Sequence, residues 1–127
     1  MSALSAFTTQ LIKFFEELRN TFPESRELKM GIEAVSNAKK VNPRLILELF
    51  DSYVYRDLSE CIYNKDMDTF RSKIKAKLQI SNNEFLSSVS IIEGQWNSLS
   101  ISNRETIWKY LRVLCILCEK ALTAGGV

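Results

Sequence analysis

Hydrophobic residues recur at helical spacing in one stretch after another along this chain of 127 residues. In residues 5–22 they follow the i, i+3, i+4 pattern, with charged residues at the positions between: Phe7, Leu11, Phe14, Phe15, Leu18 and Phe22. Such a stripe marks a helix that buries one face. The same spacing predicts further helices over residues 24–38, 43–62, 67–78, 84–97 and 102–122. We therefore expect an all-α protein, a compact bundle of about six helices.

Proline and polar cap residues set the expected helix boundaries. Pro23 ends the first helix, because proline disfavours helical geometry in the residue before it. Asn42 is a good N-cap residue and Pro43 a favoured first helical residue, so a helix is expected to begin there. Ser102 is followed by Glu105 three positions later, which is the pattern of a capping box. We therefore place the start of the last helix at Ser102 or its neighbour.

Two of the predicted helices depart from an ordinary amphipathic pattern. The helix over residues 24–38 has a thin apolar stripe, and its interior Gly31 costs about 1 kcal/mol relative to alanine unless it permits close packing. The last helix is apolar on more than one face: Ile107, Trp108, Leu111, Val113, Leu114, Cys115, Ile116, Leu117 and Cys118. A hydrophobic C-terminal helix of this kind is expected at the centre of the bundle, or else shared with a second molecule.

The composition indicates one globular domain over residues 1–127. Hydrophobic residues make up 46% and charged residues 25%, which is ordinary for a folded domain and unlike a disordered chain. The longest uninterrupted apolar run, residues 113–118, is far shorter than the roughly 20 residues of a transmembrane helix. Residues 1–10 lack the basic and apolar regions of a signal peptide. We expect an intracellular, cytoplasmic protein that does not span a membrane.

The sequence offers few routes to catalysis or metal binding. There is no histidine, which removes the commonest general base and every zinc site that uses imidazole. Cys115 and Cys118 form a C-x-x-C pattern, but they lie inside a predicted helix, so buried thiols are favoured over a redox or metal role. The third cysteine is Cys61. No phosphate-binding, dinucleotide or nucleophile motif occurs. We expect no enzymatic activity, no catalytic residue, no cofactor and no metal site.

The charged residues give one candidate contact with an anionic partner. Seventeen basic and fifteen acidic residues leave a net charge of only +2, too small to imply polyanion binding by the whole domain. Positive charge does gather around the predicted helix over residues 67–78: Lys65, Arg71, Lys73, Lys75 and Lys77. The competing interpretation is a solvated face whose lysine stems cover apolar surface.

One aromatic residue is a candidate protein contact. Tyr55 falls off the apolar stripe of its predicted helix and lies next to Arg56, so it is the aromatic side chain most expected at the surface. Tyrosine is common at the energetic centres of interfaces.

Three segments resemble small uncharacterised all-helical proteins of nucleocytoplasmic large DNA viruses: Phe22-Pro23-Glu24, Val41-Asn42-Pro43-Arg44-Leu45-Ile46-Leu47 and Ile107-Trp108-Lys109-Tyr110-Leu111-Arg112-Val113-Leu114-Cys115. The resemblance covers about half of the chain and carries no functional residue with it. It implies a protein of the virion or the virus factory, such as a minor capsid or scaffold component.

Three functions remain open from the sequence. The preferred one is a non-enzymatic protein-protein interaction or structural protein, whose partner is another protein or a second copy of itself. The second is a nucleic-acid-associated module that uses the basic helix around residues 65–77. The third is a signalling adaptor of the death-fold or Bcl-2 type, which the number of helices alone permits.

Overall fold

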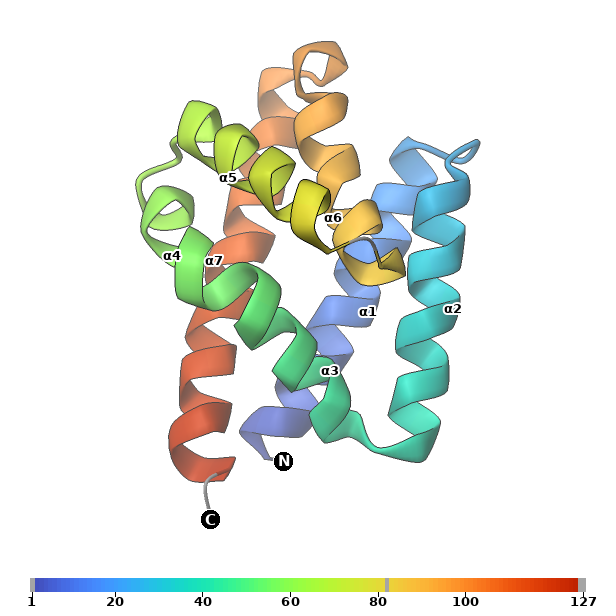
Figure 1. Ribbon diagram of the computed structural model, residues 1–127, viewed down its shortest axis with the longest axis vertical. Helices are drawn as coiled ribbons and strands as arrows, with labels where there is room; N and C mark the ends of the chain where they lie inside the picture. The colour runs from blue at the N-terminus through green and yellow to red at the C-terminus, as the bar shows by residue number, and fades with distance from the viewer. Residues whose placement is uncertain (1, 82, 126–127) are drawn as a thin grey trace.

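The computed structural model describes residues 2–81 and 83–125 and confirms an all-α bundle. The helices are α1 (Ala3–Thr21), α2 (Arg26–Val41), α3 (Pro43–Phe50), α4 (Arg56–Tyr63), α5 (Met67–Ile80), α6 (Glu84–Gly94) and α7 (Ile101–Gly125) (Figure 1). A π-helical turn, η1 (Asp51–Tyr55), joins α3 to α4, and a 3-10 turn, η2 (Trp96–Ser98), follows α6. The described residues form no strand.

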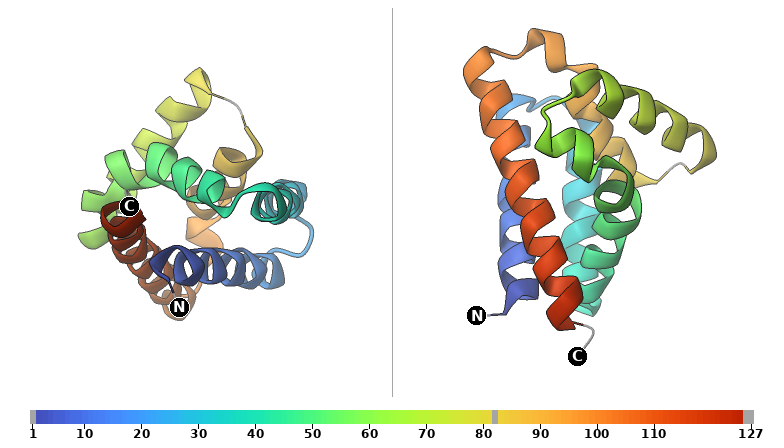
Figure 2. Two further views of the ribbon diagram at one scale, coloured as in Figure 1. Left: turned by 90° about the horizontal axis from the view of Figure 1, so that it is seen from below. Right: turned by 90° about the vertical axis from the view of Figure 1, so that its left-hand side faces the viewer.

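α1, α2 and α7 run along the height of the molecule, and α3, α4 and α5 cross its front (Figure 1). α1 packs against α7 on one side and α2 on the other, and α2 also packs along α6. The rod formed by α3, η1 and α4 crosses in front of α1 (Figure 1), and α5 contacts both α4 and α6. The start of α1 and the end of α7 lie at the same end of the bundle (Figure 2). None of the described helices is long and apolar enough to cross a membrane.

The apolar stripe predicted for the first helix lies in the core. The phenylalanines of α1 are almost wholly buried. Each contacts an aromatic ring of a different helix: Phe7 with Phe50 of α3 at 5.1 Å, Phe14 with Tyr110 of α7 at 5.1 Å, and Phe15 with Phe85 of α6 at 5.9 Å between ring centroids. Such aromatic pairs add to the stabilisation from burial alone. α1 therefore holds three other helices together.

The cap residues agree with the prediction at one boundary and differ at two. Asn42 caps α3 as expected, since its side-chain oxygen accepts from the backbone N–H of Arg44 at 3.1 Å. α2 begins two residues later than predicted because Ser25 provides its cap. The prediction of a capping box that starts at Ser102 is wrong. Ser100 caps α7 by accepting from the N–H of Asn103 at 3.1 Å, which leaves Ser102 inside the helix.

The predicted helix over residues 43–62 contains a π-helical turn. The N–H of Arg56 donates to the carbonyl of Asp51, five residues back instead of four. Asp51 is buried in this turn, and the guanidinium of Arg56 binds its carboxylate at 2.9 and 3.1 Å. A π turn changes the register of the residues that follow it. The apolar faces of α3 and α4 are thus offset in a way that the 3.6-residue period does not reveal.

The central position expected for the last helix is not confirmed. α7 runs along the outside of the bundle, at the front of the right-hand view in Figure 2. Its buried residues, which include Leu111, Leu114 and Cys118, face α1 and α4. Val113 and Ile116 lie on the outer face and remain 41% and 38% exposed. The sequence pattern showed that α7 is apolar on several sides, but not that one of those sides faces outward.

Gly31 permits the close packing of α2 on α6. A Cβ atom at this position would lie 2.5 Å from Oγ and 2.6 Å from Cβ of Ser88, and the Ser88 side chain is fully buried. Both distances are much shorter than van der Waals contact, so either the two helices or the Ser88 side chain would have to move. Close approach therefore explains why an interior glycine is used here.

Gly31→Ala is expected to lower the free energy of unfolding by about 1–2 kcal/mol, because two such short contacts place the overpacking penalty at about 2–3 kcal/mol, against roughly 1 kcal/mol gained in helix propensity. Urea denaturation followed by circular dichroism measures it. Gly94→Ala is the matched control, since a Cβ there meets nothing within 4 Å. It should leave stability unchanged or raise it slightly. Equal effects of the two substitutions would contradict the role given to Gly31.

Candidate functional site

Two lysines of the predicted basic set attach α5 to α4. Lys77 forms an ion pair with the carboxylate of Asp57, and Lys73 donates to the backbone carbonyl of the same residue at 2.9 Å. The hydrogen bond from Lys77 is the main cause that lowers the pKa of the Asp57 carboxyl. These two lysines therefore already contact oxygen atoms of α4.

Two further members of the basic set contact other helices. Lys65, in the loop before α5, pairs with Glu105 of α7 at 2.7 Å. Arg71 pairs with Glu93 of α6 at 3.3 Å, and Glu93 is mostly buried. The remaining member, Lys75, is exposed. The positive charge that the sequence gathers around α5 is thus largely balanced by acidic groups and a carbonyl from three neighbouring helices.

The structure corrects the expectation that Tyr55 is the most exposed aromatic residue. Tyr55 is half-buried and packs against the core at the end of the π turn. Burial, together with the nearby Glu119 carboxylate, raises the pKa of its hydroxyl. Tyr63, 39% exposed, is instead the most exposed aromatic residue among those that the structure describes. The prediction for Tyr55 assumed an unbroken α-helix, which η1 interrupts.

An exposed patch extends from α4 to the outer face of α7. It consists of Tyr63, Arg112, Val113 and Ile116, and we refer to it as the α4/α7 surface. The guanidinium of Arg112 lies 5.9 Å from the centroid of the Tyr63 ring, within range of a cation-π interaction. Val113 and Ile116 are neighbours at helical i, i+3 spacing on α7. The sequence pattern predicts Val113 and Ile116 within a central core helix, Tyr63 at the edge of the core and Arg112 in a narrow polar seam of the last helix, and does not indicate that they form one surface.

The three cysteines are buried, as expected for core residues. Cys115 and Cys118 are 0% exposed and Cys61 is 5% exposed, and all three are free thiols. Burial raises the pKa of Cys115 and of Cys118 to about 12. Within the described residues, no group of three or more acidic, cysteine or histidine side chains could hold a metal ion. The C-x-x-C pattern therefore has an apolar surrounding that suits packing and not thiolate chemistry.

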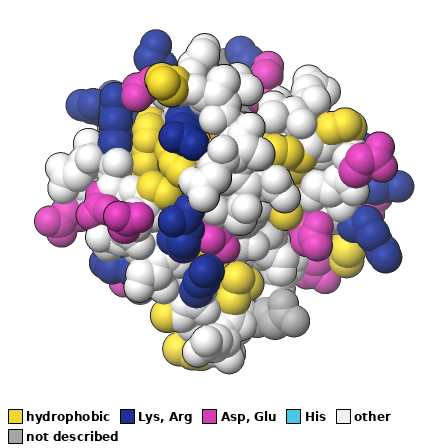
Figure 3. All heavy atoms as spheres, turned by 90° about the horizontal axis from the view of Figure 1, so that it is seen from above, with side chains coloured by type: hydrophobic (Ala, Val, Ile, Leu, Met, Phe, Trp, Pro, Cys, Tyr) yellow, Lys and Arg dark blue, Asp and Glu magenta, His cyan; other side chains and the backbone are white. Residues whose placement is uncertain are grey.

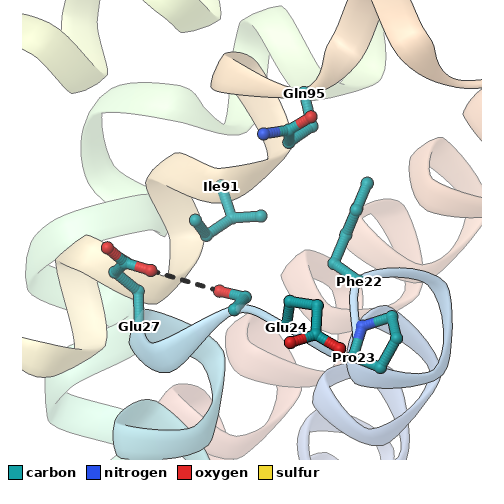
Figure 4. Close-up of a pocket in the computed structure, with 7 residues that line it drawn as sticks. Phe22, Pro23, Glu24, Glu27, Ile91 and Gln95 are labelled. Atoms are coloured by element: carbon teal, nitrogen blue, oxygen red, sulfur yellow. Dashed lines mark hydrogen bonds between the residues drawn. The ribbon is translucent and has the colours of Figure 1, made fainter.

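A cleft opens between the α1–α2 loop and α6, at the upper end of the molecule in Figure 1. Its volume is about 370 Å³, and we refer to it as the α1–α2 cleft. Figure 4 shows Phe22, Pro23 and Glu24 on the loop side and Ile91 with Gln95 on the α6 side. Glu27 lies at its edge, where its carboxylate accepts a hydrogen bond from Ser25 at 3.3 Å. The cleft thus combines apolar walls with two carboxylates, and no sequence pattern had indicated it.

No family model, no curated protein and no solved structure matches this chain.

Proposed function

We propose that this protein is a non-enzymatic interaction or structural protein that binds another protein through the α4/α7 surface. The observation that carries the proposal is the exposed pair Val113 and Ile116 on the outer face of α7. Tyrosine and arginine, the types of Tyr63 and Arg112, are enriched at the energetic centres of interfaces, and exposed apolar side chains near them add area that a partner can bury. The patch is formed by rigid helices, so a partner would bind a surface that is already in place.

The energies expected from this patch are moderate. Burying a whole valine or isoleucine side chain stabilises a complex by about 1.5–3 kcal/mol, and these two are only partly exposed in the free protein. About 1 kcal/mol from each is therefore reasonable. Arg112 and Tyr63 are already held against each other, which reduces the entropy lost when both are immobilised.

The resemblance to proteins of large DNA viruses supplies the biological setting of the proposal. In that setting the protein is a virion or virus-factory component of the minor capsid or scaffold kind. The nucleic-acid alternative has less support, because Lys65, Arg71, Lys73 and Lys77 each contact an oxygen atom within the molecule. No feature of the described residues favours the signalling-adaptor alternative.

Ile116→Glu is expected to weaken capture of the partner from the native source by at least about tenfold, a change of about 1.4 kcal/mol. Burying a carboxylate at the interface without a counter-charge is the physical reason. Quantitative affinity capture with mass spectrometry measures the loss against wild-type protein. Ser72→Glu is the control, since it adds the same charge at an exposed position of α5, a helix that contributes no residue to the patch. Capture of the same proteins at the same level by both variants would refute the proposal.

A further inference from the structure

The two ends of α2 carry surfaces of opposite character. At its C-terminal end, the turn into α3 exposes Val41 by 80% and Leu45 by 41%. Lys39 and Lys40 immediately precede Val41 and are both exposed. We call this basic and apolar projection, residues 39–45, the α2–α3 corner. It forms the lower right end of the molecule in Figure 1.

The α1–α2 cleft lies beyond the other end of the same helix. Its apolar walls are Phe22, Pro23 and Ile91, and its charged lining residues are Glu24 and Glu27. Arg26 lies between these two acidic residues in the sequence but does not line the cleft. In Figure 3, which views this end, hydrophobic, acidic and basic side chains all reach the surface on the right-hand side. The lining of the cleft is therefore complementary to an apolar group with positive charge beside it.

We infer that the α2–α3 corner of one molecule inserts into the α1–α2 cleft of a second copy. Val41 supplies the apolar group and meets Phe22, Pro23 and Ile91. Lys39 and Lys40, next to it, then approach the carboxylates of Glu24 and Glu27. The cleft volume of about 370 Å³ is at the lower end of the range for ligand pockets, roughly 300–1,000 Å³, so it has room for a few side chains.

The positions of the two surfaces determine the kind of assembly. α2 has 16 residues, so the corner and the cleft are separated by about 24 Å of rigid helix. A molecule therefore cannot insert its own corner into its own cleft. The contact joins two different surfaces, and each added copy leaves one corner and one cleft free. A contact of this type produces open linear assemblies of many copies. It produces closed rings if the rotation that relates neighbouring copies adds up to a full turn.

The contact is expected to be weak for a single pair of molecules. A projection of a few residues buries less than the roughly 1,200 Å² of a standard stable interface. Its ion pairs are solvent-exposed and are screened by salt. Assembly should therefore appear at protein concentrations in the high micromolar range and decrease as salt is raised. This inference goes beyond the proposed function and concerns surfaces distinct from the α4/α7 surface.

Sedimentation velocity on the purified full chain tests the inference with two variants. Val41→Asp disables the corner by replacing its apolar group, and it leaves the cleft intact. The double variant Glu24→Lys/Glu27→Lys disables the cleft by reversing its charge, and it leaves the corner intact. Wild-type protein should form larger species as concentration rises, and each variant alone should remain monomeric. A mixture of the two variants should form a 1:1 heterodimer and nothing larger, because one corner and one cleft remain functional between them.

The substituted residues are exposed, and thermal unfolding checks that both variants keep the wild-type fold. Wild-type protein that stays monomeric at millimolar concentration would overturn the inference, as would variants that assemble like wild type. Dimers formed by each variant alone would indicate a symmetric contact elsewhere and would also overturn it. Ile116→Glu should leave this assembly unchanged. Failure of the head-to-tail contact is therefore distinguishable from failure of the proposed partner binding.

Discussion

Trp108→Ala is expected to lower the free energy of unfolding by about 3–5 kcal/mol, the range for removing a large aromatic side chain from a core. Trp108 is 5% exposed. It meets the Trp96 ring edge-on at 5.2 Å and the Phe70 ring edge-on at 6.2 Å between centroids. One side chain of α7 thus joins η2 and α5, and its removal leaves a cavity where three elements meet. Urea denaturation measures the change.

The matched control for this substitution is Tyr63→Ala at the end of α4, the helix that packs beside α7. Tyr63 is 39% exposed, so its removal should cost clearly less than that of Trp108. The slope of the denaturation curve should be the same for both variants and for wild type, as expected if the folded state keeps its compactness. A loss of less than about 1 kcal/mol for Trp108→Ala would mean that the ring does not link these elements.

The parts of this fold that could be predicted from the sequence are those set by neighbouring residues. The apolar stripe of α1 could be read from its spacing because its members Phe7 to Leu18 lie on one helix, whereas Phe22, the last predicted member, lies just beyond the end of α1 and is only partly buried. The start of α3 could also be located, since Asn42 and Pro43 act on the backbone directly beside them. Helix existence and the all-α class follow from such local patterns.

The remaining features depend on contacts between distant residues. The sequence shows that residue 77 is a lysine, but it does not show that the fold places Asp57 next to it to form an ion pair. It shows Val113 and Ile116 in an apolar run but not that α1 and α4 cover only the opposite face of α7. The α1–α2 cleft is assembled from a loop and from α6, which are far apart in the chain. Surface charge and exposed apolar area are thus products of the packing.

The C-x-x-C cysteines should be almost unreactive in the folded protein. A pKa of about 12 for Cys115 and for Cys118, compared with the ordinary 9.0, reduces the thiolate fraction at pH 8 about 1,000-fold. Complete burial reduces access further. In a Cys61→Ser variant, labelling by a disulfide reagent at pH 8 should be at least about 1,000-fold slower than in the urea-unfolded chain. Rapid labelling of both thiols would contradict a packing role.

The same raised pKa values predict how stability changes at alkaline pH. Between about pH 9 and pH 12 the unfolded chain releases the thiol protons of Cys115 and Cys118, while the folded chain retains them. Stability therefore falls as pH rises through this interval and is unaffected by these groups below it. Replacing both cysteines by alanine should flatten this fall relative to wild type, after allowance for a constant packing loss. If the free energy of unfolding falls with pH as steeply in the double variant as in wild type, the thiols are not the groups that titrate. A less steep fall would indicate that α7 must keep both thiols neutral to pack against α1 and α4.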